Sequence, residues 1–243
     1  MLIEYGNTTV SPDWELIERV PTGYSRVYYV LSGDVTYESG NEIKHLKPGY
    51  IYVLPSTVPY HVWRSQRCDF SCTYLHVVFD LSHVCGLIEL DPAEDTCLFH
   101  YIAAIRKAIV EKRIELLERM ADCFSEFLRK NPLFEPASAM LSTVRGFIWA
   151  HITENITVSQ LSQLLSYHPN YFIHLFREET GYTPHQYIVQ QRMQHAVAQL
   201  NRGLDNDELC DICGYADSST FTRAFRQYYG VTPQKYRQGY RHP

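Results

Sequence analysis

Apolar and β-favouring residues follow a short-strand pattern in the first third of the chain. Between Tyr24 and Phe79 they form brief runs separated by turn-forming stretches such as Ser32–Asp34 and Lys47–Gly49. Runs of this length, spaced about 8–12 residues apart, are typical of an antiparallel sandwich or a small barrel. The expected strands cover residues 27–31, 35–37, 42–46, 50–54, 60–63 and 71–79.

The apolar spacing changes to a helical period over residues 98–130. Leu98, Ile102 and Ile105 recur every three or four residues, and a second series begins at Leu117. The polar stretch Glu111–Arg113 separates the two series and predicts two helices, whose apolar stripes are expected to pack on the barrel. Residues 131–137 follow with two prolines and no periodicity, which predicts a linker.

The last hundred residues contain two copies of one sequence motif. The first copy runs from Phe172 to Pro184 and the second from Phe221 to Pro233. Phe, Phe, Arg, Gly, Thr and Pro recur at the same offset in both copies. A repeat of this kind indicates a duplicated structural unit.

Helix start and stop signals surround both copies of the repeat. Thr157 and Thr183 are typical N-terminal caps, whereas Gly181 and Gly203 are typical helix ends. The expected helices cover residues 138–153, 158–166, 169–180, 184–201, 209–213 and 218–229. Two helix-turn-helix units joined by the long helix at 184–201 follow from this order. The predicted fold class is multi-domain α+β, with an N-terminal β-barrel or jelly-roll plus a helix pair and a C-terminal all-α domain.

The second helix of each helix-turn-helix has a buried face and an outward face. At about 100° per residue, Phe172 and Phe176 share one arc, and Phe221 and Phe225 do so in the second copy. Such a helix enters the major groove of DNA, so its outward residues are the predicted DNA contacts. These residues are Asn170, Ile173, His174, Arg177, Ser218, Ser219, Thr222, Arg223 and Arg226.

The outward side chains suit different parts of the DNA. Arg223 can donate two hydrogen bonds to guanine, and Asn170 can pair similarly with adenine. Arg177 and Arg226 lie nearer the helix ends and suit phosphates. Any one of these polar residues could simply face solvent. The prediction of DNA contact therefore depends on the same outward face recurring on both helices.

Charge is distributed unevenly between the two halves. Residues 1–137 carry 13 Lys and Arg against 19 Asp and Glu, a net −6, whereas residues 138–243 carry 9 against 8, a net +1. This asymmetry favours the second half as the side that meets a polyanion. The sequence shows neither a signal peptide at its start nor a run of about 18 apolar residues, so a cytoplasmic protein with no membrane partner is expected.

The seven cysteines show no disulfide spacing, so free and mostly buried thiols are expected. Cys210 and Cys213 have the spacing of half a zinc or redox site. Their counterparts in the other copy of the repeat are Ser162 and Leu165, which favours core packing over metal binding.

Residues 138–243 closely resemble the DNA-binding domain of the AraC/XylS family of transcription regulators. The most specific stretch is Gly214–Phe221, and it continues through Phe225–Pro233. Earlier glycine- and proline-containing stretches, Leu46–Tyr50 and Pro59–His61, resemble the cupin-like sensor domain of the same family.

The resemblance implies three parts and a mode of action. A cupin-like sensor and dimerisation domain with the helix pair is expected at 1–130, a linker at 131–137, and an AraC-type double helix-turn-helix domain at 138–243. A homodimer formed through the helix pair is expected, with activation of transcription more often than repression.

Metal-binding cupins carry a histidine cluster beside the first glycine of their pattern, but the stretch Gly33–Gly40 contains no histidine. His61 alone does not hold an ion, so no metal and no cofactor is predicted. Aromatic side chains with a few polar tips instead suit a small polar effector such as a sugar. The predicted ligand-binding residues are His61, Trp63, Tyr74, His76, Arg26 and Tyr28.

The sequence therefore predicts a ligand-responsive, sequence-specific DNA-binding transcription regulator and not an enzyme. Two alternatives stay open at this point. One is a metal-free cupin enzyme fused to a DNA-binding domain. The other is a regulator whose barrel is only a structural dimerisation unit, because small barrels are either filled by side chains or hold one ligand.

Overall fold

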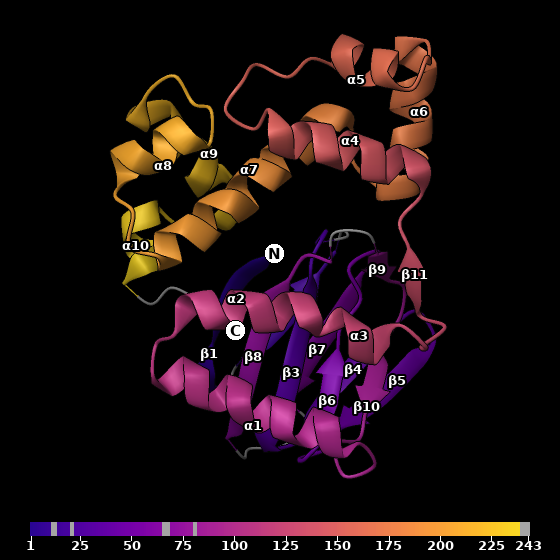
Figure 1. Ribbon diagram of the computed structural model, residues 1–243, viewed down its shortest axis with the longest axis vertical. Coiled ribbons are helices and arrows are strands. Elements are labelled where there is room, and N and C mark those ends of the chain that lie inside the picture. The colour runs from indigo at the N-terminus through magenta and orange to yellow at the C-terminus, as the bar shows by residue number, and fades with distance from the viewer. Residues whose placement is uncertain (11–13, 20–21, 65–68, 80–81, 239–243) are drawn as a thin grey trace. The chain divides into compact units, whose positions relative to one another are not determined.

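The computed structural model describes residues 1–10, 14–19, 22–64, 69–79 and 82–238. The chain divides into two units, Met1–Pro136 and the residues from Ala137 onward. Within the described residues, no helix is long and apolar enough to cross a membrane. Figure 1 shows a first unit of strands and helices and a second unit built of helices.

Two antiparallel sheets enclose the core of the first unit. In spatial order, the larger sheet consists of β1 (Leu2–Val10), β8 (Phe70–Val77), β3 (Ser25–Ser32), β6 (Ile51–Val53) and β10 (Ile88–Leu90). The smaller sheet consists of β2 (Glu15–Glu18), β7 (Tyr60–Arg64), β4 (Val35–Ser39) and β5 (Glu42–Leu46). The six strands expected from the sequence are all present, and the fold class is confirmed.

Side chains alternate between the two faces of the larger sheet, as strand geometry requires. Tyr28 and Val30 face the smaller sheet and share a core with its Tyr37 and Val62. Val27 belongs instead to a second core beneath the helices. Those helices are α1 (Thr96–Val110), α2 (Ile114–Cys123) and α3 (Ser125–Leu128).

The helix pair lies on one face of the larger sheet, as expected (Figure 1). Leu98, Ile105 and Leu117 are almost fully buried against that sheet. The chain reverses between α1 and α2 at Lys112, whose φ of 55° is left-handed. The break predicted at Glu111–Arg113 is therefore confirmed.

Among the described residues, five strands lie outside the expected set. The longest is β1, which pairs along its length with β8, from Leu2 opposite Val77 to Val10 opposite Phe70. Gly6 and Asn7, which have low strand propensity, interrupt its apolar pattern, so local sequence gives little sign of it. Hydrogen bonds to β8 hold β1 extended, so pairing with a distant strand overrides the low strand propensity of its own residues.

The segment expected to be a linker is partly a strand. β11 (Phe134–Pro136) pairs with β9 (Ser82–Val84) in a separate two-stranded sheet. Pro136 stands at the end of β11, where the missing N–H of proline breaks no ladder within the strand. All of the expected linker except Ala137 therefore belongs to the first unit.

The second unit consists of seven helices in its described residues. They are α4 (Ala139–Ala150), α5 (Val158–Leu164), α6 (Pro169–Thr180), α7 (Pro184–Asn201), α8 (Asn206–Ile212), α9 (Ser218–Tyr229) and α10 (Pro233–Arg237). Figure 1 shows α5 and α6 at one end of α7, and α8, α9 and α10 at its other end. The long helix α7 therefore connects two helix-turn-helix units, as the sequence predicts.

The two copies of the repeat have the same local geometry. Gly181 and Gly230 end α6 and α9 in the left-handed conformation, each with φ of 76°. Thr183 and Thr232 then cap the next helices, each accepting a hydrogen bond from a backbone N–H three residues on. Glycine is favoured at such helix ends because it has no Cβ to clash.

Candidate DNA-binding surface and sensor interior

The first helix-turn-helix is fixed by capping and by two phenylalanines. Thr157 and Gln160 form a capping box at the start of α5. The chain turns at Ser166, with φ of 56°, before α6 begins at Pro169. Phe172 and Phe176 are fully buried, and each such side chain contributes about 1.5–3 kcal/mol of burial energy. Their burial determines which side of α6 faces outward.

The outward side of α6 presents the residues expected there. Asn170, His174 and Arg177 are exposed, and Ile173 is half-buried. His174 Nδ1 lies 3.4 Å from Glu178 Oε2, so a carboxylate shares this face with the histidine. All four predicted residues thus lie outside the hydrophobic core; their contact with DNA stays a prediction.

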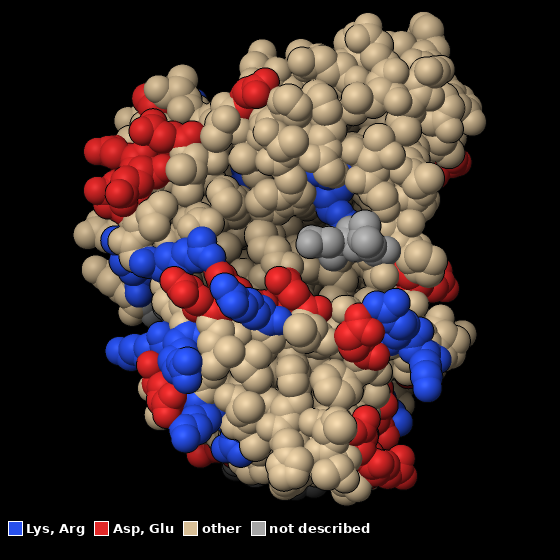
Figure 2. All heavy atoms as spheres, in the orientation of Figure 1, with Lys and Arg blue, Asp and Glu red and all other residues tan. Residues whose placement is uncertain are grey.

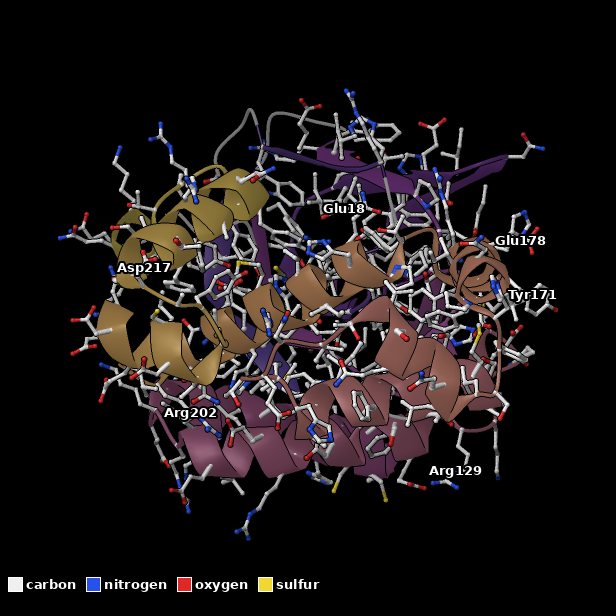
Figure 3. All side chains as sticks on the ribbon, turned by 90° about the horizontal axis from the view of Figure 1, so that it is seen from above. Glu18, Arg129, Tyr171, Glu178, Arg202 and Asp217 are labelled. Atoms are coloured by element: carbon white, nitrogen blue, oxygen red, sulfur yellow. The ribbon has the colours of Figure 1, made fainter. Side chains whose placement is uncertain are left out.

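An aromatic residue that the sequence reasoning missed also lies on α6. Tyr171 is 57% exposed and packs edge-on against Tyr167, with ring centroids 5.4 Å apart. Figure 3 shows Tyr171 and Glu178 pointing away from the ribbon of α6. The sequence signal was available, because Tyr171 lies outside the arc of Phe172 and Phe176.

The second helix-turn-helix is fixed by a close backbone approach at its turn. Asp205 and Glu208 form a capping box at the start of α8. Gly214 follows α8 with φ of 68°, close to the carbonyls of Ile152 and Thr153 after α4. Asp217 then caps α9, accepting a hydrogen bond from Thr220 N at 2.7 Å. Hydrogen bonds from Thr220 hold the pKa of Asp217 below its ordinary value, so this cap is charged at neutral pH.

The outward side of α9 brings its five predicted residues together. Ser219, Arg223 and Arg226 are exposed, and Ser218 and Thr222 are half-buried. These five residues and Thr232 line one open hollow on the surface. A surface of hydroxyl and guanidinium groups can donate hydrogen bonds both to base edges and to phosphates.

Acidic side chains cover the neighbouring helix α8. Asp205, Asp207, Glu208 and Asp211 are all exposed there, and Figure 2 shows acidic side chains gathered over this helix. Carboxylates at a helix start interact favourably with the helix dipole, which accounts for those in the first turn. They also reduce the attraction of this surface for phosphates.

Cys210 and Cys213 are buried where α8 packs in the second unit. Cys210 Sγ donates to the Tyr215 carbonyl at 3.3 Å, and Cys213 Sγ donates to the Arg192 carbonyl at 3.5 Å. Burial raises the pKa of Cys213 to about 12, so this thiol stays protonated. Each cysteine therefore serves as a small core residue with a satisfied donor. Cys68, also expected to be a free thiol, lies outside the described residues.

In the first unit, Arg26 is the centre of a buried polar network. Its side chain reaches Glu18 Oε1 at 2.6 Å, Tyr24 Oη at 2.8 Å and Tyr60 Oη at 2.5 Å. Arg26 is only 3% exposed, so three partners compensate for the loss of its hydration. Burial raises the pKa of Tyr24 to about 12, which keeps this phenol neutral.

Tyr28, Tyr74 and His76 share the interior with Arg26. Register places His76 opposite Arg26 and Tyr74 opposite Tyr28 on adjacent strands. His76 Nδ1 lies 3.3 Å from Glu4 Oε2, and both side chains are almost fully buried. Burial lowers the pKa of His76 despite its hydrogen bond to Glu4, so the ring is neutral at neutral pH. Four of the six predicted ligand-binding residues thus lie together.

His61 and Trp63 lie on the other face of their strand. Along β7, Tyr60, Val62 and Arg64 are buried, whereas His61 and Trp63 are only half-buried. The two rings stack with centroids 4.5 Å apart, and His61 Nε2 lies 3.3 Å from Glu15 Oε2. His61 and Trp63 therefore lie apart from the other four predicted residues, because a strand directs alternate side chains to opposite faces. Tyr60, which was not among the predicted residues, points inward and contacts Arg26.

Comparisons with known proteins agree with this architecture. A helix-turn-helix domain family matches residues 161–239. The uncharacterized HTH-type transcriptional regulator YobQ of Bacillus subtilis (strain 168) is 32% identical over 218 residues, which cover 88% of this chain and 86% of YobQ. The melibiose operon regulatory protein of Escherichia coli (strain K12) is 23% identical over an alignment of 250 residues, covering 89% of this chain and 82% of that protein.

A solved structure shares the fold of the chain. The crystal structure of unsaturated fatty acid bound ToxT from Vibrio cholerae has a TM-score of 0.66 at 11% identity, covering 96% of this chain and 94% of ToxT. The duplicated helix-turn-helix, the strand-rich first unit and the near full-length likeness to YobQ lead to one assignment. The chain belongs to the AraC/XylS family of helix-turn-helix transcriptional regulators.

Proposed function

We propose that this regulator binds specific double-stranded DNA through the outward faces of α6 and α9. The observation that carries the proposal is that both helices bury two phenylalanines and expose polar residues on the opposite side. A solvated surface accounts for one such face, but a matched pair on a duplicated motif favours a repeated ligand. Two successive major-groove segments, about 34 Å apart, are such a ligand.

Selection of bound sequences from a random pool of duplexes tests this function. We expect enriched DNA to contain two short conserved blocks whose centres are about one helical turn apart. Enrichment of a single block, or of no sequence at all, would contradict reading by both helices. Because the second half carries a net charge of only +1, affinity for unrelated DNA should be weak and only mildly salt-dependent.

We further propose that the first unit responds to a small polar effector held in the interior that contains Arg26, Tyr28, Tyr74 and His76. Tyrosine hydroxyls and a guanidinium beside aromatic rings suit a sugar or a similar polyhydroxy compound. The name of the melibiose operon regulatory protein supports the same class of effector. An effector regulates only if it binds two arrangements of the protein with different affinities.

A specific observation favours the second candidate, in which the first unit is only structural. Arg26 already has three polar partners, and Tyr28 and Tyr74 are almost fully buried. A thermal-shift screen of sugars and metabolites separates the two candidates. Stabilisation by one compound, lost in Tyr74→Phe but kept in His61→Ala, supports the effector site. The absence of any stabilising compound supports a structural barrel.

We propose that the protein is a homodimer in which α1 and α2 contact a second copy. Packing on the sheet leaves Phe99 53%, Val110 74% and Leu116 36% exposed on these helices. Sedimentation of the intact chain should show a dimer that Val110→Glu or Leu116→Glu converts to monomer, because a charge would be buried at the contact. Ile43→Glu is the control, since Ile43 is 64% exposed but lies on β5. An unchanged dimer in both helix variants would place the interface elsewhere.

Activation of transcription is the proposed outcome of DNA binding, on the family resemblance. A reporter gene placed downstream of a selected operator distinguishes activation from repression. Higher expression in the presence of the protein supports activation, and lower expression identifies a repressor.

A further inference from the structure

The two-stranded sheet β9–β11 brings together three potential metal ligands from distant parts of the sequence. Glu135 on β11 lies directly opposite His83 on β9. Cys85 follows two residues after His83, and its N–H donates to the Leu133 carbonyl at 2.9 Å, so the ladder continues past the end of β9. Residues two apart on a strand share a face. His83, Cys85 and Glu135 therefore project from one side of this sheet.

The ligand atoms of these three residues are close to one another. His83 Nε2 lies 3.9 Å from Glu135 Oε2, and one ligand atom from each residue lies within 4.8 Å of the other two. In a tetrahedral zinc site with usual bond lengths, neighbouring ligand atoms are about 3.3–3.6 Å apart. The side chain of Glu135 is 56% exposed, so rotation about its torsions can bring its carboxylate closer to the other two ligand atoms.

The other face of the same sheet is anchored in the hydrophobic core. Val84 is fully buried, and Phe134 packs edge-on against Phe79 with ring centroids 5.1 Å apart. Cross-strand pairing and this packing fix the backbone beneath the three ligands. The backbone positions are therefore set before any ion binds, and only side-chain torsions remain to adjust.

The set of donors selects the class of ion. A thiolate, an imidazole and a carboxylate together suit Zn²⁺, and thiolate ligands disfavour Mg²⁺ and Ca²⁺. Only the deprotonated thiolate binds the ion, so binding would release a proton from Cys85.

We propose that His83, Cys85 and Glu135 bind one Zn²⁺ ion, with a water molecule as the fourth ligand. This site is separate from the histidine cluster of metal-binding cupins, which the stretch Gly33–Gly40 lacks, and from Cys210 and Cys213. The ion would link β9 to β11, the last strand before the unit boundary at Ala137. It would thereby hold the segment that leads into the second unit against β9.

Titration of the metal-free, full-length protein with Co²⁺ tests the site. Co²⁺ takes the same ligands as Zn²⁺, and its bond to a thiolate absorbs in the near ultraviolet. We expect a band that saturates at one Co²⁺ per chain and disappears when Zn²⁺ is added. Cys85→Ser should abolish the band, whereas Cys97→Ser, Cys123→Ser and Cys210→Ser should retain it.

Glu135→Gln is the second variant, because the side chain of Glu135 is 56% exposed and glutamine keeps its size. It should keep the thiolate band but weaken Co²⁺ binding at least about tenfold, since loss of outer-shell partners alone costs about 10–100-fold. His83→Asn should weaken binding similarly. No band in the wild type, an undiminished band in Cys85→Ser, or unchanged affinity in both other variants would overturn the proposal. These outcomes do not depend on DNA binding, so they are independent of the proposed function.

Discussion

Replacing Gly214 by alanine is expected to destabilise the second helix-turn-helix by roughly 2–5 kcal/mol. Gly214 has φ of 68°, where a Cβ strains the backbone by about 1–2 kcal/mol. An added Cβ would also lie 2.7 Å from Thr153 O and 2.8 Å from Ile152 O, both backbone atoms. Backbone cannot move aside as a flexible side chain does, so α8 or α9 must shift and DNA binding should fail.

Gly230→Ala is the matched control for this effect. Gly230 has φ of 76°, but an added Cβ would meet no atom within 4 Å. It should therefore show only the backbone strain of about 1–2 kcal/mol. Hydrogen exchange of the α8 and α9 amides in the full chain measures both costs. Equal losses in the two variants would mean that the close approach at Gly214 contributes nothing.

Replacing Arg223 by alanine is expected to lower affinity for the selected DNA by about 1–3 kcal/mol and to relax the preference at one base pair. Arg223 is exposed on α9 and lines the surface hollow with Ser219 and Thr222. A guanidinium in a recognition helix can donate two hydrogen bonds to guanine, and alanine leaves those acceptors unpaired. Binding measured against every single-base variant of the operator checks both parts.

Arg226→Ala separates base reading from phosphate binding. Arg226 is exposed three residues further along the same helix, near its C-terminal end. Its loss should weaken binding to all sequences alike and reduce the slope of log affinity against log salt by about 1. If Arg223→Ala left both affinity and base preference unchanged, α9 would not read DNA through Arg223.

The helical half was accessible from the sequence because its signals are local. Helices α6, α7 and α9 have the predicted bounds. Gly181 ends α6, Thr183 begins α7, and Asp217 and Gly230 bound α9. Caps, left-handed glycines and a 3.6-residue period act within one or two turns of chain. The repeat then assigned outward faces to α6 and α9 without knowledge of the tertiary structure. Burial on α5 does not follow residue type alone, since Leu164 is 44% exposed while Ser162 is buried.

In the strand-rich half, the sequence located six strands but not their partners. β1 forms because β8 supplies its hydrogen bonds, and β11 forms because β9 lies beside it. Such pairings join residues far apart in the chain, and a short apolar run does not indicate which segment it will pair with. This is also why part of the expected linker is a strand.

By itself, the sequence determined the family, the duplicated helix-turn-helix and the face that each second helix turns outward. Only the tertiary structure decided which face of β7 is internal, placing Tyr60 beside Arg26 and leaving His61 and Trp63 outside. It alone brought Glu135 opposite His83 and close to Cys85. Helical faces follow from spacing along one segment, whereas strand faces and cross-strand clusters depend on register with distant segments.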